Sequence, residues 1–188
     1  MNKSLAKLTI KEQALEEQPM SLEVEFGEKN SEEKPLLIGW REWAQLPELN
    51  IPLIKVKVDT GAKTSALHAY DIKIIKSDQK EFVEFVIHPI QTNDKVCVPC
   101  RAEIVGMKTI KSSNGHKQIR PVIRTSIKIG NHSWDIEITL TNRDIMHHRM
   151  LLGRTAMLNL LVNPSKSYYQ GFISKTAVLN SYNAIYAK

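Results

Sequence analysis

The stretch Ile54-Lys55-Val56-Lys57-Val58-Asp59-Thr60-Gly61-Ala62 places an acidic turn directly after an alternating run of apolar and basic residues. This alternation is typical of a β-strand with one buried face, so residues 54–58 are predicted to form such a strand. Glycine lets the backbone after Asp59 approach its surroundings closely, and the Thr60 hydroxyl can brace the turn by a hydrogen bond. The sequence therefore predicts a tight loop of Asp59, Thr60 and Gly61 that points a carboxylate into a cleft.

The chemistry that such a loop supports depends on a second carboxylate. Two carboxylates a few ångströms apart share one proton, because they cannot both ionise, and the pair can activate a water molecule for attack on a peptide carbonyl. The chain contains a single Asp-Thr-Gly, since the other aspartates lack a following Thr/Ser-Gly: Asp71, Asp78, Asp94, Asp135 and Asp144. Catalysis by Asp59 therefore requires a homodimer with both loops at its two-fold axis.

The rest of the body carries the pattern of an all-β domain. Apolar runs bounded by turn residues predict further strands over residues 71–75, 81–87, 96–104, 118–129 and 133–141. Gly130-Asn131 predicts a tight hairpin, and Ser112-Ser113-Asn114-Gly115 predicts a second turn. Residues 39–43 are interpreted as a helical turn or the entry to a strand, and only residues 154–161 are predicted to be a helix. Many short strands separated by turns favour a closed or sandwich-like β domain.

The charge divides the 188 residues into two parts. Residues 1–35 hold five Lys and eight Glu, a net charge of −3, and are predicted to be a flexible charged extension. The total is +6, so residues 36–188, the predicted domain, carry +9 by subtraction. A basic body suits acidic partners, but the lysines are scattered and no aromatic–basic pattern of an RNA-binding sheet is present. Nucleic-acid binding is therefore a third hypothesis, behind the two given below.

The sequence also bears on the compartment. Two cysteines, Cys97 and Cys100, are too few for a disulfide scaffold. No apolar run reaches the length of a membrane-spanning helix, and no apolar run of signal-peptide length follows the first residues. The expectation is a cytoplasmic protein without a membrane partner.

The order of the motifs resembles that of retroviral proteases over roughly residues 52–162. In those proteins an Asp-Thr-Gly-Ala turn, a flap hairpin, a further hairpin and an apolar-apolar-Gly-Arg segment follow one another. Here the corresponding segments are residues 59–62, the region around residues 112–115, residues 126–140 and Leu151-Leu152-Gly153-Arg154. The resemblance implies a closed retropepsin-like (acid protease) β-barrel with one short helix near the C-terminus, and a peptidase of the aspartic type.

A bacterial family named for ATP-dependent zinc proteases, the RimB-like family, is more closely similar. The matching stretches cover most of residues 36–170, and they are residues 38–43, 57–69, 123–125, 139–146 and 149–154. His147-His148 departs from the family's pattern, in which a small residue and an aromatic residue are expected. Members are encoded beside, or fused to, RimK-type ATP-grasp glutamate ligases. The resemblance implies a ligase partner and a substrate among glutamate-rich peptides or tails.

The family name implies zinc and ATP, and the motifs support neither. There is no His-Glu-x-x-His pair, and the six histidines show no zinc-site spacing: His68, His88, His116, His132, His147 and His148. Cys97-x-x-Cys100 is half of a structural zinc site at best, since no second Cys/His pair follows at the usual distance. No Gly-x-x-x-x-Gly-Lys-Ser/Thr phosphate loop is present. No cofactor and no metal ligand are therefore predicted, and any ATP dependence would come from a partner ligase.

Arginines are the candidate substrate-binding residues, because a guanidinium group binds a carboxylate through two parallel hydrogen bonds. If Arg101, Arg120 and Arg124 converge near Asp59, they would recognise an acidic peptide. The alternative interpretation is three unrelated surface arginines. Ser113, in the region that corresponds to the flap, is also a candidate substrate-binding residue.

Three further residues are predicted to support the structure: Arg143, Gly153 and Arg154. The resemblance to retropepsins implies that Arg154 supports the dimer and the active-site loops by ion pairing. The leading hypothesis is thus a homodimeric aspartic-type peptidase acting on glutamate-rich peptides. The alternative is a non-catalytic retropepsin-like module that binds or regulates the ligase or its acidic substrate.

Overall fold

The computed structural model describes residues 34–91, 93–111, 115, 117–142 and 148–186. Its strands are β1 (Leu36–Gly39), β2 (Arg41–Leu46), β3 (Ile51–Val58), β4 (Ser65–His68), β5 (Tyr70–Ser77), β6 (Lys80–Ile87), β7 (Val98–Lys111), β8 (Lys117–Ile129), β9 (His132–Thr141), β10 (Met150–Leu152) and β11 (Leu160–Asn163). Its helical segments are the 3₁₀ turns η1 (Pro47–Leu49) and η2 (Arg154–Ala156), and the α-helix α1 (Lys175–Tyr186). The predicted extension lies outside the described residues as far as residue 33, so it stays a prediction.

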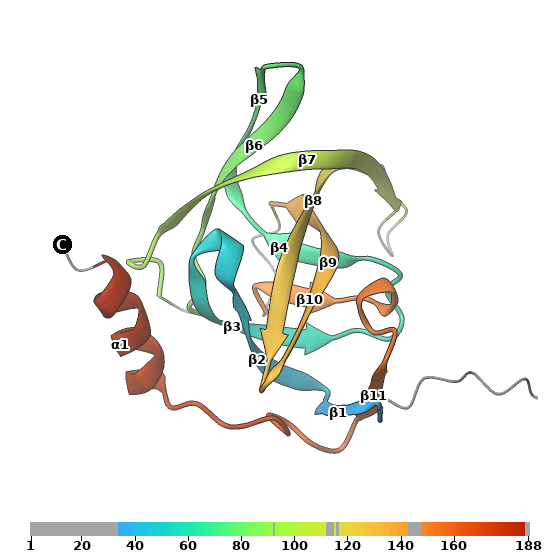
Figure 1. Ribbon diagram of the computed structural model, residues 1–188, viewed down its shortest axis with the longest axis vertical. Coiled ribbons are helices and arrows are strands. Elements are labelled where there is room, and N and C mark those ends of the chain that lie inside the picture. Colours follow the sequence, from blue (N-terminus) through green and yellow to red (C-terminus); the bar gives the residue numbers. More distant parts are fainter. Residues whose placement is uncertain (1–33, 92, 112–114, 116, 143–147, 187–188) are drawn as a thin grey trace, which may run out of the picture. The chain divides into compact units, whose positions relative to one another are not determined.

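A closed ring of six strands forms the centre of the domain, in the order β2-β3-β10-β4-β9-β8 (Figure 1). The ring closes where Gln45 of β2 pairs with Lys128 of β8. Alternate side chains of these strands point inward, as the alternation in residues 54–58 predicts. The enclosed core is almost wholly aliphatic, and its fully buried members include Ile54, Val56, Leu67, Ile127, Ile138, Leu140, Met150 and Leu152. The prediction of a closed all-β domain is confirmed.

Beyond the ring, three long antiparallel strands continue the sheet from β8 in the order β7-β6-β5. Figure 1 shows the β5–β6 hairpin projecting from the barrel, while β7 passes across its end. The hairpin at Gly130-Asn131 is confirmed, because Ile129 pairs with His132 and Gly130 has a φ of +59°, a conformation that glycine adopts readily. The predicted turn at residues 112–115 falls mostly outside the described residues.

The C-terminal segment wraps back onto the start of the domain. β11 pairs in parallel with β1 as a separate two-stranded sheet. The fully buried carboxylate of Glu42 on β2 accepts hydrogen bonds from the backbone N–H groups of Gly39 (2.6 Å), Tyr169 (2.8 Å) and Gln170 (3.3 Å). The Tyr182 hydroxyl of α1 donates to the Leu53 carbonyl of β3. These contacts hold the last part of the described chain against the barrel.

The helix near the C-terminus is present, but the prediction of a helix over residues 154–161 is wrong. Residues 154–156 form a single 3₁₀ turn, and Leu160–Asn163 is the strand β11. The amides of Arg154 and Thr155 donate to the carbonyls of Ala62 (2.9 Å) and Lys63 (3.0 Å). The segment is therefore held by the loop after β3 and then by β1, and the α-helix lies at Lys175–Tyr186 instead. Residues 39–43 are strands joined by a bend at Trp40.

Among the described residues, no helix has the length and apolar character needed to cross a membrane.

Candidate active site

The Asp59 loop begins where β3 ends beside β10. These strands are parallel neighbours, and the Asp59 N–H donates to the Leu152 carbonyl at 2.9 Å. The Asp59 Oδ1 atom accepts hydrogen bonds from the N–H groups of Gly61 and Ala62, each at 3.1 Å. The loop thus orients its own carboxylate through two backbone amides. Gly61 also has little room for a side chain, because an added Cβ atom would lie 3.3 Å from Asp59 Oδ1.

Residues 153–155 hold this loop from the other side. The Arg154 Nη1 atom donates to the carbonyls of Thr60 and Gly61, each at 2.8 Å. Gly153 is required for the close approach, since an added Cβ atom would lie 2.4 Å from the Thr64 carbonyl carbon. The structure thus brings Gly153 and Arg154 to the loop, as predicted. Arg154 supports the loop through hydrogen bonds to backbone carbonyls, whereas the predicted ion pairing would need a carboxylate. The third predicted supporting residue, Arg143, lies outside the described residues.

An open cleft of about 900 Å³ lies between the Asp59 loop and the β7–β8 hairpin. Asp59 lines it together with four cationic side chains: Lys63, Lys108, Lys111 and Arg120. Arg120 is 5% exposed, and its Nε atom donates to Gln118 Oε1 at 3.0 Å, so its guanidinium is held in place. One carboxylate and four cations give this cleft a positive potential that favours anionic ligands.

The three candidate arginines do not converge. Arg120 lines the cleft with Asp59, as the hypothesis of an acidic substrate requires. Arg124 lines a neighbouring cavity of about 190 Å³. Arg101 is exposed on β7, lies over the Phe82 ring at 4.7 Å, and lines a third cavity without Asp59. Ser113 lies outside the described residues.

Three lysines of the cleft were not identified from the sequence. Lys63 follows the Asp-Thr-Gly-Ala motif by one residue, and this adjacency is the signal that places it at the cleft. Lys108 and Lys111 belong to the part of β7 that leads into the β7–β8 hairpin. They were not distinguishable from other surface lysines, because only the pairing of β7 with β8 carries them to the cleft.

One of these lysines is already in an ion pair. The Lys108 Nζ atom lies 2.6 Å from the Glu137 carboxylate on β9. This hydrogen bond and the positive charge of Lys108 lower the pKa of Glu137, and the charge of Arg124 acts in the same direction. Both partners are partly exposed, so the pair is of the kind that contributes little to stability.

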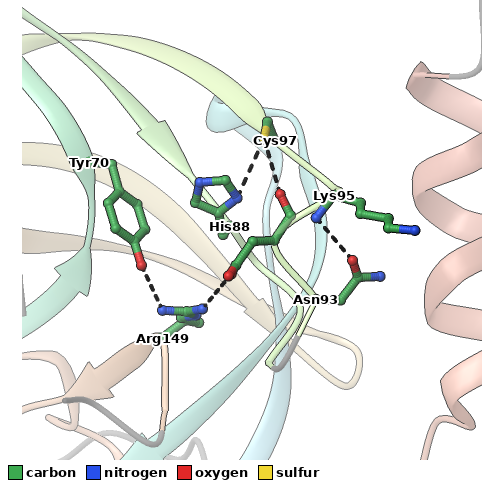
Figure 2. A network of polar contacts seen from close by, with 7 residues as sticks. Tyr70, His88, Asn93, Lys95, Cys97 and Arg149 are labelled. Carbon is green, nitrogen blue, oxygen red and sulfur yellow. Dashed lines mark hydrogen bonds and ion pairs between the residues drawn. The ribbon is translucent and has the colours of Figure 1, made fainter. Parts of the chain in front are cut away.

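The two cysteines lie in different surroundings, although only two residues separate them in the sequence. Cys97 is exposed, and its Sγ atom lies 3.4 Å from His88 Nδ1 in a polar network that includes Asp94 and Arg149 (Figure 2). Cys100 is buried and its thiol contacts the Leu49 carbonyl, and burial raises its pKa to about 12. The two thiols thus differ in exposure and in their hydrogen-bond partners. The described residues contain no group of three or more metal-ligating side chains.

Comparison with curated proteins finds relatives that are named as glutamate ligases. The chain is 44% identical over 153 residues to a "Probable alpha-L-glutamate ligase" of Shewanella halifaxensis, covering 81% of this chain and 33% of that protein. It is 43% identical over 147 residues to a protein of the same name from Desulfotalea psychrophila, covering 78% of this chain and 32% of that protein. The chain thus spans about a third of the length of these curated relatives.

A solved structure and a family model complete the comparison. The fold matches a Legionella pneumophila protein of unknown function, with a TM-score of 0.62 and 30% identity, over 72% of this chain and 98% of that one. The family model matches residues 37–172, which include the Asp59 loop, the β7–β8 hairpin and Arg154. The barrel is therefore retropepsin-like, and the chain belongs to the family described as the retropepsin-like aspartic endopeptidase RimB.

Proposed function

We propose that this chain is an aspartic-type peptidase that acts as a homodimer, with one Asp59 from each chain. The observation that carries the proposal is the Asp59 carboxylate at the cleft, oriented by two backbone amides of its own loop. In such a dimer one carboxylate would take a proton from a water molecule while the other donates a proton to the peptide carbonyl oxygen. The resulting tetrahedral intermediate then collapses as the amine leaves with a proton. The pair titrates as a unit.

The dimer is required by the chemistry, since the chain supplies one Asp-Thr-Gly loop. A two-fold axis beside the loop would bring the same segment of each chain together, because an isologous interface uses one patch twice. Thr60, Gly61 and Arg154 are all exposed, so the loop and its support are accessible to a second chain. This accessibility supports the proposed arrangement.

The substrate that we propose is a glutamate-rich peptide or tail, of the kind that an ATP-grasp ligase would make. The cationic side chains of the cleft support an acidic substrate, and the guanidinium of Arg120 among them is held in place by Gln118. The relatives named as glutamate ligases support an association with such a ligase. We propose that this ligase is a partner of the chain.

The second candidate is a non-catalytic module that binds or regulates the ligase or its acidic substrate. The observation that favours it is that the basic cleft belongs to one chain and needs no second carboxylate to bind an anion. The matching segment is also about a third of proteins named as ligases. A binding module would keep its affinity for acidic peptides when Asp59 is changed and would cleave nothing.

The decisive experiment is the Asp59→Asn variant of the full chain, assayed by mass spectrometry on a glutamate-rich peptide. We expect cleavage to be abolished, whereas Asp78→Asn, in the exposed β5–β6 turn, leaves it unchanged. Cleavage by Asp59→Asn would refute the aspartic mechanism. If neither the wild-type chain nor the Asp78→Asn control cleaved the peptide, the binding module would be favoured.

A mixing experiment tests the dimer. If wild-type chains and an equal amount of Asp59→Asn chains assort at random, about half of the wild-type chains enter mixed dimers with one carboxylate. Activity per wild-type chain should then fall to about half. An unchanged activity per wild-type chain would show that one chain suffices.

A further inference from the structure

The Lys108–Glu137 ion pair joins β7 to β9 across the strand that lies between them. We propose that this ion pair crosses the substrate groove and determines specificity, because an acidic substrate exchanges its own carboxylate for that of Glu137 on Lys108. The inference rests on the proposed function, since it takes the ligand to be an acidic peptide. It adds a residue, Glu137, that competes with the substrate for its binding site.

Strand register places the pair on the face of the sheet that lines the cleft. Lys108 pairs with Arg120 on β8, and Glu137 pairs with Arg124 on the same strand. Residues separated by an even number along a strand share one face, so Arg120 and Arg124 point to the same side. They are about 13 Å apart along the strand at the usual rise per residue. Val122, between them on this face, is only 2% exposed.

The pair also stands between two cavities. Lys108 lines the cleft that contains Asp59, whereas Glu137 lines the smaller cavity that contains Arg124. Thr155 lines both, so the two cavities adjoin. With the ion pair formed, Arg124 is separated from the Asp59 cleft. If Lys108 released Glu137, the two cavities would form one groove with a further guanidinium at its end.

An acidic side chain is the ligand that can bring about this exchange. The side chains of Lys108 and Glu137 are 38% and 43% exposed, and ion pairs this exposed contribute little to stability. A substrate carboxylate can therefore replace Glu137 at low cost, whereas a neutral glutamine side chain cannot. Glu137 thus lowers the affinity for acidic ligands and leaves the affinity for neutral ligands unchanged.

The test is a binding measurement in the Asp59→Asn background, which prevents cleavage. Fluorescence anisotropy would give the Kd of a labelled glutamate-rich peptide and of its glutamine counterpart. We expect Glu137→Gln to bind the glutamate peptide about two- to fivefold more tightly, the factor that corresponds to an exposed ion pair. Binding of the glutamine peptide should not change. Lys108→Gln should weaken binding of the glutamate peptide.

Two controls separate the release of Lys108 from a general change in charge. Glu103→Gln removes the same charge from a matched exposed ion pair, Lys80–Glu103 (2.9 Å), whose residues do not line the cleft, and should leave the Kd unchanged. In the double variant Lys108→Gln/Glu137→Gln, the gain from Glu137→Gln should disappear, because there is no lysine to release.

The outcomes distinguish the inference from the proposed function. If the glutamate peptide binds but the gain persists in the double variant, or appears equally in Glu103→Gln, the role of Glu137 is refuted and the acidic substrate stands. If the glutamate peptide binds no better than the glutamine peptide to any of these proteins, the acidic substrate is refuted and the inference with it. A gain that is confined to Glu137→Gln and requires Lys108 supports both.

Discussion

Glu42 offers the sharpest test of how the barrel is held to its C-terminal segment. Its carboxylate is fully buried, and three backbone N–H groups donate to it, one from Gly39 and two from Tyr169 and Gln170. Replacing Glu42 by alanine would leave three donors without their acceptor, the buried N–H of Gly39 and the partly buried N–H groups of Tyr169 and Gln170, which lose less. A buried donor without a partner costs about 1–3 kcal/mol. We therefore expect Glu42→Ala to lower the free energy of unfolding by roughly 3–6 kcal/mol.

The amide variant gives a graded comparison. Oε1 accepts from Gly39 and Tyr169, and Oε2 accepts the longer bond from Gln170. Glutamine keeps one acceptor oxygen, so it can preserve the two short bonds while its NH₂ group faces the Gln170 N–H, a donor opposite a donor. The loss for Glu42→Gln should be smaller, about 1–3 kcal/mol. Glu48→Gln is the control, because Glu48 is exposed and accepts a single bond, from Ser126.

Urea unfolding of the full chain at pH 7, followed by circular dichroism, measures these differences. Hydrogen exchange adds a local readout, since the amides of Tyr169 and Gln170 should exchange faster in both Glu42 variants. Equal losses for alanine and glutamine, or losses below about 1 kcal/mol for both, would refute the reasoning. Either result would mean that the carboxylate is not the acceptor that stabilises this junction.

Three further predictions concern the loop and the core. Arg154→Met removes both charge-assisted bonds to the loop carbonyls and should lower kcat for peptide cleavage at least about tenfold, whereas an unchanged kcat would exclude a role in positioning the loop. Gly153→Ala should lower the stability in urea by about 1–3 kcal/mol because its Cβ atom has no room, whereas Gly106→Ala, with nothing within 4 Å, should not; equal effects would contradict the packing argument. Burial raises the pKa of Tyr182, and it raises the pKa of Cys100 to about 12. Because the unfolded chain therefore loses these protons at lower pH than the folded one, the free energy of unfolding should fall as pH rises above about 9. A Tyr182→Phe variant whose free energy of unfolding falls equally steeply at alkaline pH would argue against a contribution from Tyr182.

The strands of the barrel were predictable because their signal is local. The alternation in residues 54–58 predicts which residues face the core, and Gly130-Asn131 predicts where the chain reverses. Both the strand and the turn are present in the structure. The turn-rich pattern also excluded a βαβ fold. These features depend on neighbours two or three residues away, so one sequence is sufficient to identify them.

The helix assignment failed because the deciding contacts are distant in sequence. Residues 154–161 contain apolar residues at helical spacing, but the amides of Arg154 and Thr155 bond to the loop after β3, and Leu160 pairs with Leu36. The α-helix was missed because it buries only Val178 and Tyr182. Two buried positions in twelve residues give a weak periodic signal.

The candidate site was predictable in part for the same reason. The Asp-Thr-Gly motif identifies Asp59 and Gly61, and the position directly after Gly153 identifies Arg154. The convergence of Lys108 and Arg120 on the cleft follows from the register of β7 with β8, which the sequence does not state. Arg101 shows the opposite outcome. It belongs to β7, as Lys108 does, but its position in the sheet places it at another cavity.

The way the ring closes has a consequence for how the protein is made. The pairs that complete it join segments far apart in the chain: Gln45 with Lys128, Val56 with Met150 and Ser65 with Ile138. Folds dominated by such contacts form slowly, and synthesis proceeds from the N-terminus. β3 therefore emerges from the ribosome long before β10, and its edges stay available for wrong pairing in that interval. Arg154 is 94 residues from Thr60, so the Asp59 loop can acquire its support only when most of the domain has been synthesised.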